Sequence, residues 1–151
     1  MSEKAIAKAE EIVKSKTAEV GMGAGVTLSL LDHEGYPTTS TLSISKADGI
    51  SQITFGVSLD SNKAKRAKEN GRASLCIFDD DYESGSYYNI TLVGDIEVLT
   101  NPEIKKETWY EGLEEHFENG ADDPNYCVLK FTTKRYNLWV DVDEAETTGS
   151  F

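Results

Sequence analysis

The residues best suited to chemistry in this sequence are Ser61, Asn62 and Lys63, which supply a hydroxyl, an amide and an ammonium in succession. The segment before them, 53–58, alternates larger apolar residues with smaller ones, as half-buried strands do. Asp60 and Ser61 are favoured N-cap residues, so the three side chains should begin a helix. Free backbone N–H groups and the helix dipole favour an anion there. The stretch therefore predicts a phosphate site.

Charge also distinguishes this stretch. The chain has a net charge of −12, yet five of its fifteen basic residues lie between Lys63 and Arg72. A solvated helix face explains Lys65, Arg66 and Lys68, whereas Lys63 shares the first turn with the caps. A helix dipole contributes about 0.3–1 kcal/mol to an exposed anion, and micromolar binding needs roughly 8 kcal/mol. Most of the binding energy must therefore come from a ring held elsewhere.

Length and composition predict a single domain over residues 1–151. The acidic balance argues against nucleic acid and anionic membrane surfaces as partners. No apolar run is long enough to span a membrane, and the N-terminus lacks the apolar core of a signal peptide. Cys76 and Cys127 are expected to be buried free thiols, which predicts the reducing cytoplasm.

The pattern of elements predicts a mainly β, α+β fold. Helices are expected at 2–18, 61–70 and 101–118, and strands at 26–31, 37–45, 50–57, 73–78, 86–99 and 126–142. Residues 46–49 should turn, 79–85 should form a loop, Gly94 should bulge and the tail 143–151 should fray. Strands and helices do not alternate regularly, so an antiparallel sheet of six or so strands, closed into a small barrel with helices at its openings, fits best.

No familiar catalytic constellation is present in the sequence. His33 falls in a turn and His116 in an acidic helix, and there is no nucleophile elbow or zinc-type Cys-His spacing. The glycine-rich run 20–26 lacks the spacing and context of a dinucleotide loop, so it is expected to be a flexible entry to the first strand. We predict no metal site, and a cofactor would have to carry any chemistry.

A nine-residue motif resembles that of the pyridoxamine 5′-phosphate oxidase-like flavoproteins, the FMN-binding split barrels. The family pattern F-x-T-x-x-x-S-x-K is matched by Phe55, Ser61 and Lys63, with Val57 in place of threonine. The segments 35–45, 88–94 and 135–139 are similar to further family strands in the same order. The general stress protein branch is the most similar branch of the family.

The resemblance implies an FMN cofactor at the interface of a homodimer. Lys63 and Ser61 would hold the phosphate, assisted by Asn62, Ser58 and the backbone of Val57. The flavin ring would contact hydroxyl or backbone groups of Ser40, Thr41 and Leu42. It would also contact the amide of Asn89 and the indole of Trp139. Trp139 has the alternative role of a core or dimer aromatic.

Three functions remain open from the sequence. The first is an FMN-dependent oxidoreductase of unknown substrate. The second is a non-catalytic split-barrel or stress-associated module without flavin, and the third is a barrel for another phosphorylated ligand such as a deazaflavin or pyridoxal phosphate. A true pyridoxamine phosphate oxidase is not expected, because its basic C-terminal substrate segment is replaced here by the acidic residues 141–146.

Overall fold

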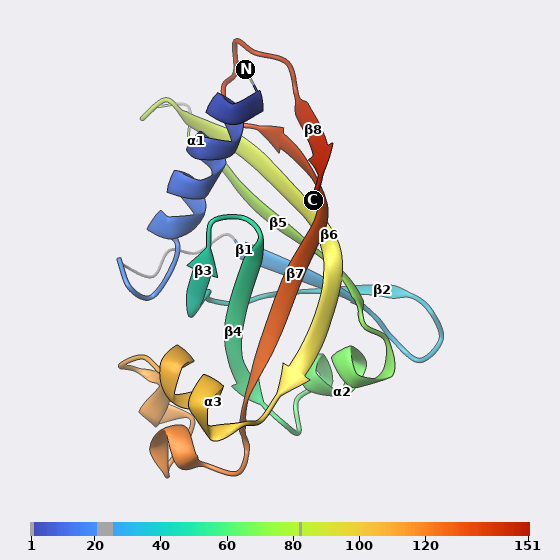
Figure 1. The fold of residues 1–151 in the computed structure, drawn as a ribbon, viewed down its shortest axis with the longest axis vertical. Helices are drawn as coiled ribbons and strands as arrows, with labels where there is room; N and C mark the ends of the chain where they lie inside the picture. The colour runs from blue at the N-terminus through green and yellow to red at the C-terminus, as the bar shows by residue number, and fades with distance from the viewer. Residues whose placement is uncertain (1, 21–25, 82) are drawn as a thin grey trace.

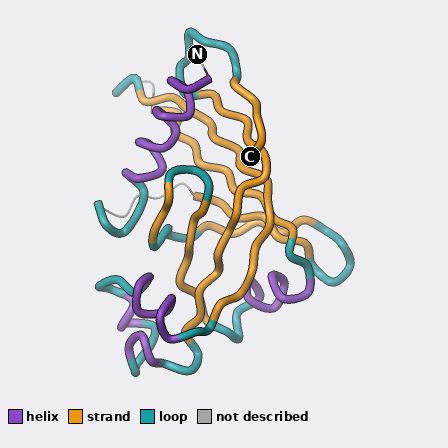
Figure 2. The backbone as a smooth tube through the Cα atoms, in the orientation of Figure 1, coloured by secondary structure: helices purple, strands orange, loops and turns teal. Residues whose placement is uncertain are grey.

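The computed structural model of the chain describes residues 2–20, 26–81 and 83–151. The predicted flexible entry at 20–26 lies outside the described residues except at its two ends. The elements, shown in Figures 1 and 2, follow in chain order: α1 (Ser2–Ser15), β1 (Val26–Leu31), β2 (Pro37–Thr41), β3 (Lys46–Asp48), β4 (Gln52–Ser58), α2 (Asn62–Glu69), β5 (Arg72–Asp81), β6 (Ser86–Leu99), α3 (Pro102–Thr108), η1 (Leu113–Glu115), η2 (Gly120–Asp122), β7 (Tyr126–Trp139) and β8 (Thr147–Ser150).

The described strands form one antiparallel sheet of eight strands. Its order is β2-β1-β5-β6-β7-β4-β3, and β8 pairs with β7 beside this path. The outermost strands of the order, β2 and β3, do not pair with each other, so the sheet curls without closing. This confirms the predicted mainly β split barrel, with more strands than expected. None of the described helices is long and apolar enough to cross a membrane.

The core lies on the concave inner face of this sheet. Val26, Leu28 and Leu30 alternate inward along β1, and α1 covers the sheet with Ala9 and Val13, both fully buried. Each such large apolar side chain contributes about 1.5–3 kcal/mol through burial. The amphipathic stripe of the N-terminal helix therefore packs on the sheet as predicted, although the helix ends at Ser15 rather than at residue 18.

Three expected segments of the sheet differ from the prediction. The expected strand 37–45 stops at Thr41, because Ile44 is fully buried and its carbonyl accepts a hydrogen bond from the Ala18 N–H. The expected turn 46–49 is instead largely the short strand β3, paired with β4. The expected loop 79–85 begins late, because β5 continues to Asp81 and pairs with the first residues of β6. The first difference follows from a contact with the distant residue Ala18, whereas the other two follow from hairpin pairing between neighbouring segments.

The third helix is shorter than predicted, ending at Thr108 instead of residue 118. Gly112 adopts a φ of 111°, which an α-helix excludes, and only two short 3-10 turns follow. The Tyr126 ring organises this segment, with Trp109 edge-on at 5.2 Å and Phe117 at 5.0 Å between ring centroids. Buried Lys105 donates its ammonium to the Asp123 carbonyl at 2.9 Å. Tertiary packing therefore overrides the helical pattern here.

The C-terminal tail is not frayed, contrary to the prediction. β8 pairs with β7 from Leu138↔Thr147 to Arg135↔Ser150, and the Phe151 N–H donates to the Lys134 carbonyl at 2.9 Å. The Tyr136 ring lies over Gly149, a position where a side chain would collide with it. The tail thus adds a strand to the sheet. The local sequence of the tail does not predict this, because it depends on an unpaired edge of β7.

The predicted bulge at Gly94 is confirmed by a register shift in the β6–β7 ladder between Val93 and Gly94. A Cβ atom at this position would collide with the backbone carbonyl of Thr132. We expect Gly94→Ala to lower the free energy of unfolding by about 1–3 kcal/mol, measured by urea denaturation. Gly71→Ala is the control, because its Cβ would lie 3.4 Å from the Ile96 carbonyl. Equal stability of the two variants would contradict this account of the bulge.

Candidate functional site

The start of α2 has the geometry that the sequence predicts. Ala64 and Ala67 are buried and fix the helix against the core, where it packs on β1, β4 and β6. Ser61 is the N-cap, with extended backbone angles. The cap leaves the N–H groups of the first turn, including those of Asn62 and Lys63, without intrahelical acceptors. This end of the helix therefore presents an anion-binding set of donors.

The Ser61 hydroxyl is already engaged within the loop. It accepts a hydrogen bond from the Ala64 N–H at 3.2 Å and donates to the Ser58 carbonyl at 2.6 Å. Its single proton is therefore not directed toward a ligand. Ser61 shapes the site by capping the helix, while Val57 is buried and Ser58 is half-buried at the end of β4.

The cations of α2 are not neutralised within the described part of the chain. No ion pair joins Lys63, Lys65 or Arg66 to any described acidic residue. Lys63 is half-buried at the first turn, whereas Lys65 lies exposed on the far side. Partial burial reduces screening by water and salt, so Lys63 interacts more strongly with an anion at the cap than its exposed neighbours do.

A second set of predicted residues meets on the outer face of the sheet, which we define as the side of β1, β5, β6 and β7 that points away from the core. Asn89 of β6 pairs directly with Trp139 of β7 and, on its other side, with Phe78 of β5. Tyr87 packs edge-on against Trp139 at 4.9 Å between centroids. Phe78 is 45% exposed. The outer face thus gathers three aromatic rings around one amide.

The structure adds Asn137, which the sequence interpretation missed. It lies in the neighbouring outer-face row, made of Thr27, Cys76, Thr91 and Asn137. Its Oδ1 atom is buried without a hydrogen-bond partner among the described residues. A buried acceptor without a donor costs about 1–3 kcal/mol. The available signal was the period-two alternation of β7, which places Asn137 on the same face as Trp139.

The three predicted ring contacts in and after β2 do not all lie on the outer face. Thr41 pairs with Thr27 and so continues the outer-face row, whereas Ser40 pairs with Leu28 and falls on the other side of the strand. Leu42 follows β2, packs against the core and donates its N–H to the Val26 carbonyl at 3.1 Å. Of these three predicted ring contacts, Thr41 shares the face of Asn89 and Trp139.

The two predicted clusters lie at opposite ends of the molecule. Ser58, beside the helix cap, pairs with Tyr126 at the start of β7, and Asn89 pairs with Trp139 at its end. β7 is 14 residues long, so about 40 Å of strand separates them. Figure 1 shows β7 running the length of the fold between these ends. The structure does not bring the phosphate and ring residues together within one chain.

No classical nucleophile or metal centre accompanies these clusters. Burial raises the pKa of the Cys127 thiol to about 11 and also raises the pKa of Cys76, so neither is a thiolate near neutral pH. His33 and His116 are both exposed, away from the outer face. Within the described ranges, no group of three or more His, Cys, Asp or Glu side chains is arranged to hold a metal ion.

The family model described as pyridoxamine 5′-phosphate oxidase like matches residues 7–149. The chain belongs to this family. Membership confirms the resemblance drawn from the motif that ends at Lys63. None of the curated proteins compared with the chain matches it.

Solved structures agree with this membership. A Clostridium acetobutylicum protein related to general stress protein 26 is 26% identical with a TM-score of 0.79, over 99% of this chain and 96% of that one. General stress protein 26 of Bacillus anthracis is 14% identical with a TM-score of 0.71, over 94% and 96%. A heme binding protein of Mycobacterium smegmatis is 20% identical with a TM-score of 0.71, over 97% and 57%. The last two share the fold.

The capping role of Ser61 can be tested separately from any ligand. We expect Ser61→Ala to lower the free energy of unfolding by about 1 kcal/mol, because the Ala64 N–H loses its acceptor. Ser61→Asp restores an acceptor and should retain most of the stability. Urea denaturation without ligand measures both variants. A wild-type midpoint for Ser61→Ala would rule out the cap as the function of this hydroxyl.

Proposed function

We propose that this family member is an FMN-binding homodimer that acts as an oxidoreductase on a small molecule. The observation that carries the proposal is the half-buried Lys63 beside a capped helix N-terminus, within the family motif and without an ion pair to any described residue. Bound FMN would supply hydride or electron transfer, and the chain would supply binding, orientation and electrostatics.

The phosphate would be held at α2. Lys63 provides the charge, and the first-turn N–H groups of Asn62 and Lys63 provide directed donors. The absence of a neutralising carboxylate among the described neighbours supports this role, because an anion here gains attraction without breaking an ion pair. Ser61 and Ser58 would contribute by holding the cap in shape.

The flavin ring would lie on the outer face. The Oδ1 atom of Asn137 needs a donor, and the edge of a flavin ring carries an N–H group. Asn89 offers an amide beside it, while Trp139 and Phe78 offer apolar aromatic surface. Burial of such rings supplies the energy that a phosphate site alone lacks.

A homodimer would reconcile the two clusters. One FMN cannot extend along the length of β7, so the ring residues would have to come from the partner subunit. The partially apolar outer face, with Phe78, Thr91 and Trp139 across three strands, is the surface that a second copy would cover. Two symmetric sites would result from one two-fold axis.

Other ligands fit less well. Heme, named for the Mycobacterium smegmatis neighbour, requires an axial ligand. Neither described histidine lies on the outer face, and burial raises the pKa of the outer-face thiol of Cys76, which disfavours the thiolate that would bind iron. A deazaflavin or pyridoxal phosphate would share the phosphate site, so a ligand comparison must include both.

Two unpaired cysteines, Cys76 and Cys127, support a reducing compartment such as the cytoplasm.

The first test is FMN affinity, measured by quenching of flavin fluorescence. We expect Lys63→Ala to weaken FMN binding by about tenfold or more, equivalent to about 1.4 kcal/mol. Lys65→Ala is the matched control on the exposed side of the same helix and should bind like wild type. Equal affinities of the two variants would remove Lys63 from the site. A protein that takes up no FMN and shows no visible flavin band would support the non-catalytic alternative.

The shared site makes a separate prediction for mixed dimers. Lys63→Ala and Asn137→Ala should each bind FMN weakly as homodimers. A heterodimer of the two, purified through different tags, should regain one site with wild-type affinity, because one interface then pairs an intact Lys63 with an intact Asn137. Sites formed within one chain would leave both halves of the heterodimer impaired, which would refute the shared arrangement.

A further inference from the structure

A groove runs along α1 on the opposite side of the sheet from the outer face. It consists of two adjoining cavities of about 630 Å³ and 380 Å³, which share Lys8, Glu11, Val140 and Asp141. Ligand pockets typically measure about 300–1,000 Å³. The groove is therefore large enough for a small organic molecule.

Strand alternation separates this groove from the proposed flavin site. Asp79 of β5, Tyr88 of β6 and Val140, directly after β7, line it, and each is adjacent in sequence to an outer-face residue. Neighbouring residues of a strand point to opposite faces. Only Tyr87, at the hairpin, borders both regions, since it lines the groove and packs against Trp139. A ligand in the groove would bind without occupying the outer face.

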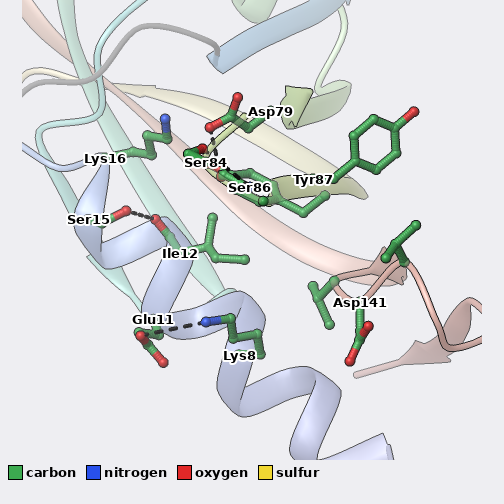
Figure 3. Close-up of a pocket in the computed structure, with 14 residues that line it drawn as sticks. Lys8, Glu11, Ile12, Ser15, Lys16, Asp79, Ser84, Ser86, Tyr87 and Asp141 are labelled. Atoms are coloured by element: carbon green, nitrogen blue, oxygen red, sulfur yellow. Dashed lines mark hydrogen bonds and ion pairs between the residues drawn. The ribbon is translucent and has the colours of Figure 1, made fainter. Parts of the chain in front are cut away.

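The two walls of the groove carry opposite charge. One wall carries Lys4 and Lys8 of α1, with Glu11 of the same helix, and Lys16, which directly follows the helix. The opposite wall supplies the carboxylates of Asp79, Asp141 and Glu144. Figure 3 shows Lys8 and Lys16 on the helix side and Asp79 and Asp141 on the strand side. The groove thus has a cationic wall and an anionic wall.

Among the described residues, the ion pair formed by the α1 lysine Lys8 lies on the helix itself and not across the groove. Lys8 pairs with Glu11 on its own helix at 3.8 Å, and no ion pair joins Lys4 or Lys8 to Asp141 or Glu144. The acidic side is held in place locally, because Asp141 accepts a hydrogen bond from the Asp143 N–H at 3.0 Å. A carboxylate retains further acceptor capacity after one such bond.

The floor between the walls is apolar. Ile12 of α1 is buried, and Val140 and Tyr88 are half-buried and pack against the main core. Figure 3 shows Ile12 between Lys8 and Lys16, directed toward the cavity. An occupant would therefore need apolar surface in its middle and opposite charges directed toward the two walls.

We propose that the groove binds a small zwitterion, an amino acid or dipeptide with an apolar side chain. Its carboxylate would face Lys8 on α1, its ammonium would face Asp141 and Asp79, and its side chain would rest on Ile12 and Val140. Opposite charges on facing walls select for a molecule that carries both, because each single charge would satisfy one wall and leave the other unpaired. This site is independent of the proposed function.

The test uses the dipeptide Leu-Leu and its two blocked forms, N-acetyl-Leu-Leu and Leu-Leu amide, in isothermal titrations with the full chain. We expect Leu-Leu to bind at one site per chain, and each blocked form to bind about tenfold or more weakly. NMR shifts of the Tyr88 and Val140 amides should localise the binding. No heat and no shift at millimolar Leu-Leu would overturn the proposal, as would equal binding of a blocked form.

Matched variants complete the test. Lys8→Gln and Asp141→Asn should each weaken Leu-Leu binding by about tenfold. Lys14→Gln, on the same helix but outside the groove lining, and Asp122→Asn, in the distant η2 turn, should leave it unchanged. Loss of binding in the control variants alone would place the peptide elsewhere and refute the groove.

Discussion

The structure depends on the pairing of β6 with β7. Each strand is 14 residues long, and their ladder continues from Asn89↔Trp139 to Leu99↔Val128. β7 also pairs with β4 near one end and with β8 near the other. A ladder of this length must twist, and the Gly94 bulge relieves it where the Thr132 backbone approaches most closely. Three further strands pair directly with the two strands of this ladder, β5 with β6 and both β4 and β8 with β7.

The same ladder determines the layout of function. Its strand β7 pairs with Ser58 of β4 through Tyr126 at one end and with Asn89 of β6 through Trp139 at the other, so the chain presents an anion-binding end and an aromatic end far apart. Ligand binding across both ends requires a second copy, and the outer face has the chemistry to receive one. The length of β7 is thus the observation that motivates the proposed dimer.

The two sides of the sheet serve different purposes. The inner face is packed by α1 and α2, whose small residues Ala9, Ala64 and Ala67 allow close approach. At the hairpin end α1 no longer covers the strands tightly, and the charged groove opens there. On the outer face the Oδ1 atom of Asn137 is buried without a hydrogen-bond partner among the described residues. The two candidate binding surfaces therefore lie on opposite faces of the same strands, because neighbouring residues of a strand point to opposite faces.

Local patterns in the sequence were sufficient for β1, β6 and the start of α2, because their alternation and caps depend on adjacent residues. They also determined the family, through the motif ending at Lys63. The early end of α3 and the added β8 depended on partners elsewhere in the chain, the Tyr126 ring and the free edge of β7, and the short β3 depended on its hairpin partner Ile53 in β4. The candidate site divides in the same way. The roles of Ser61 and Lys63 could be predicted, because helix N-caps and first-turn cations are recognisable in the local sequence. The hydrogen bonds of the Ser61 hydroxyl, the Asn137 Oδ1 atom without a described partner and the distance between the two clusters could not be predicted. They depend on how the strands pair, and pairing brings together residues that no local pattern relates.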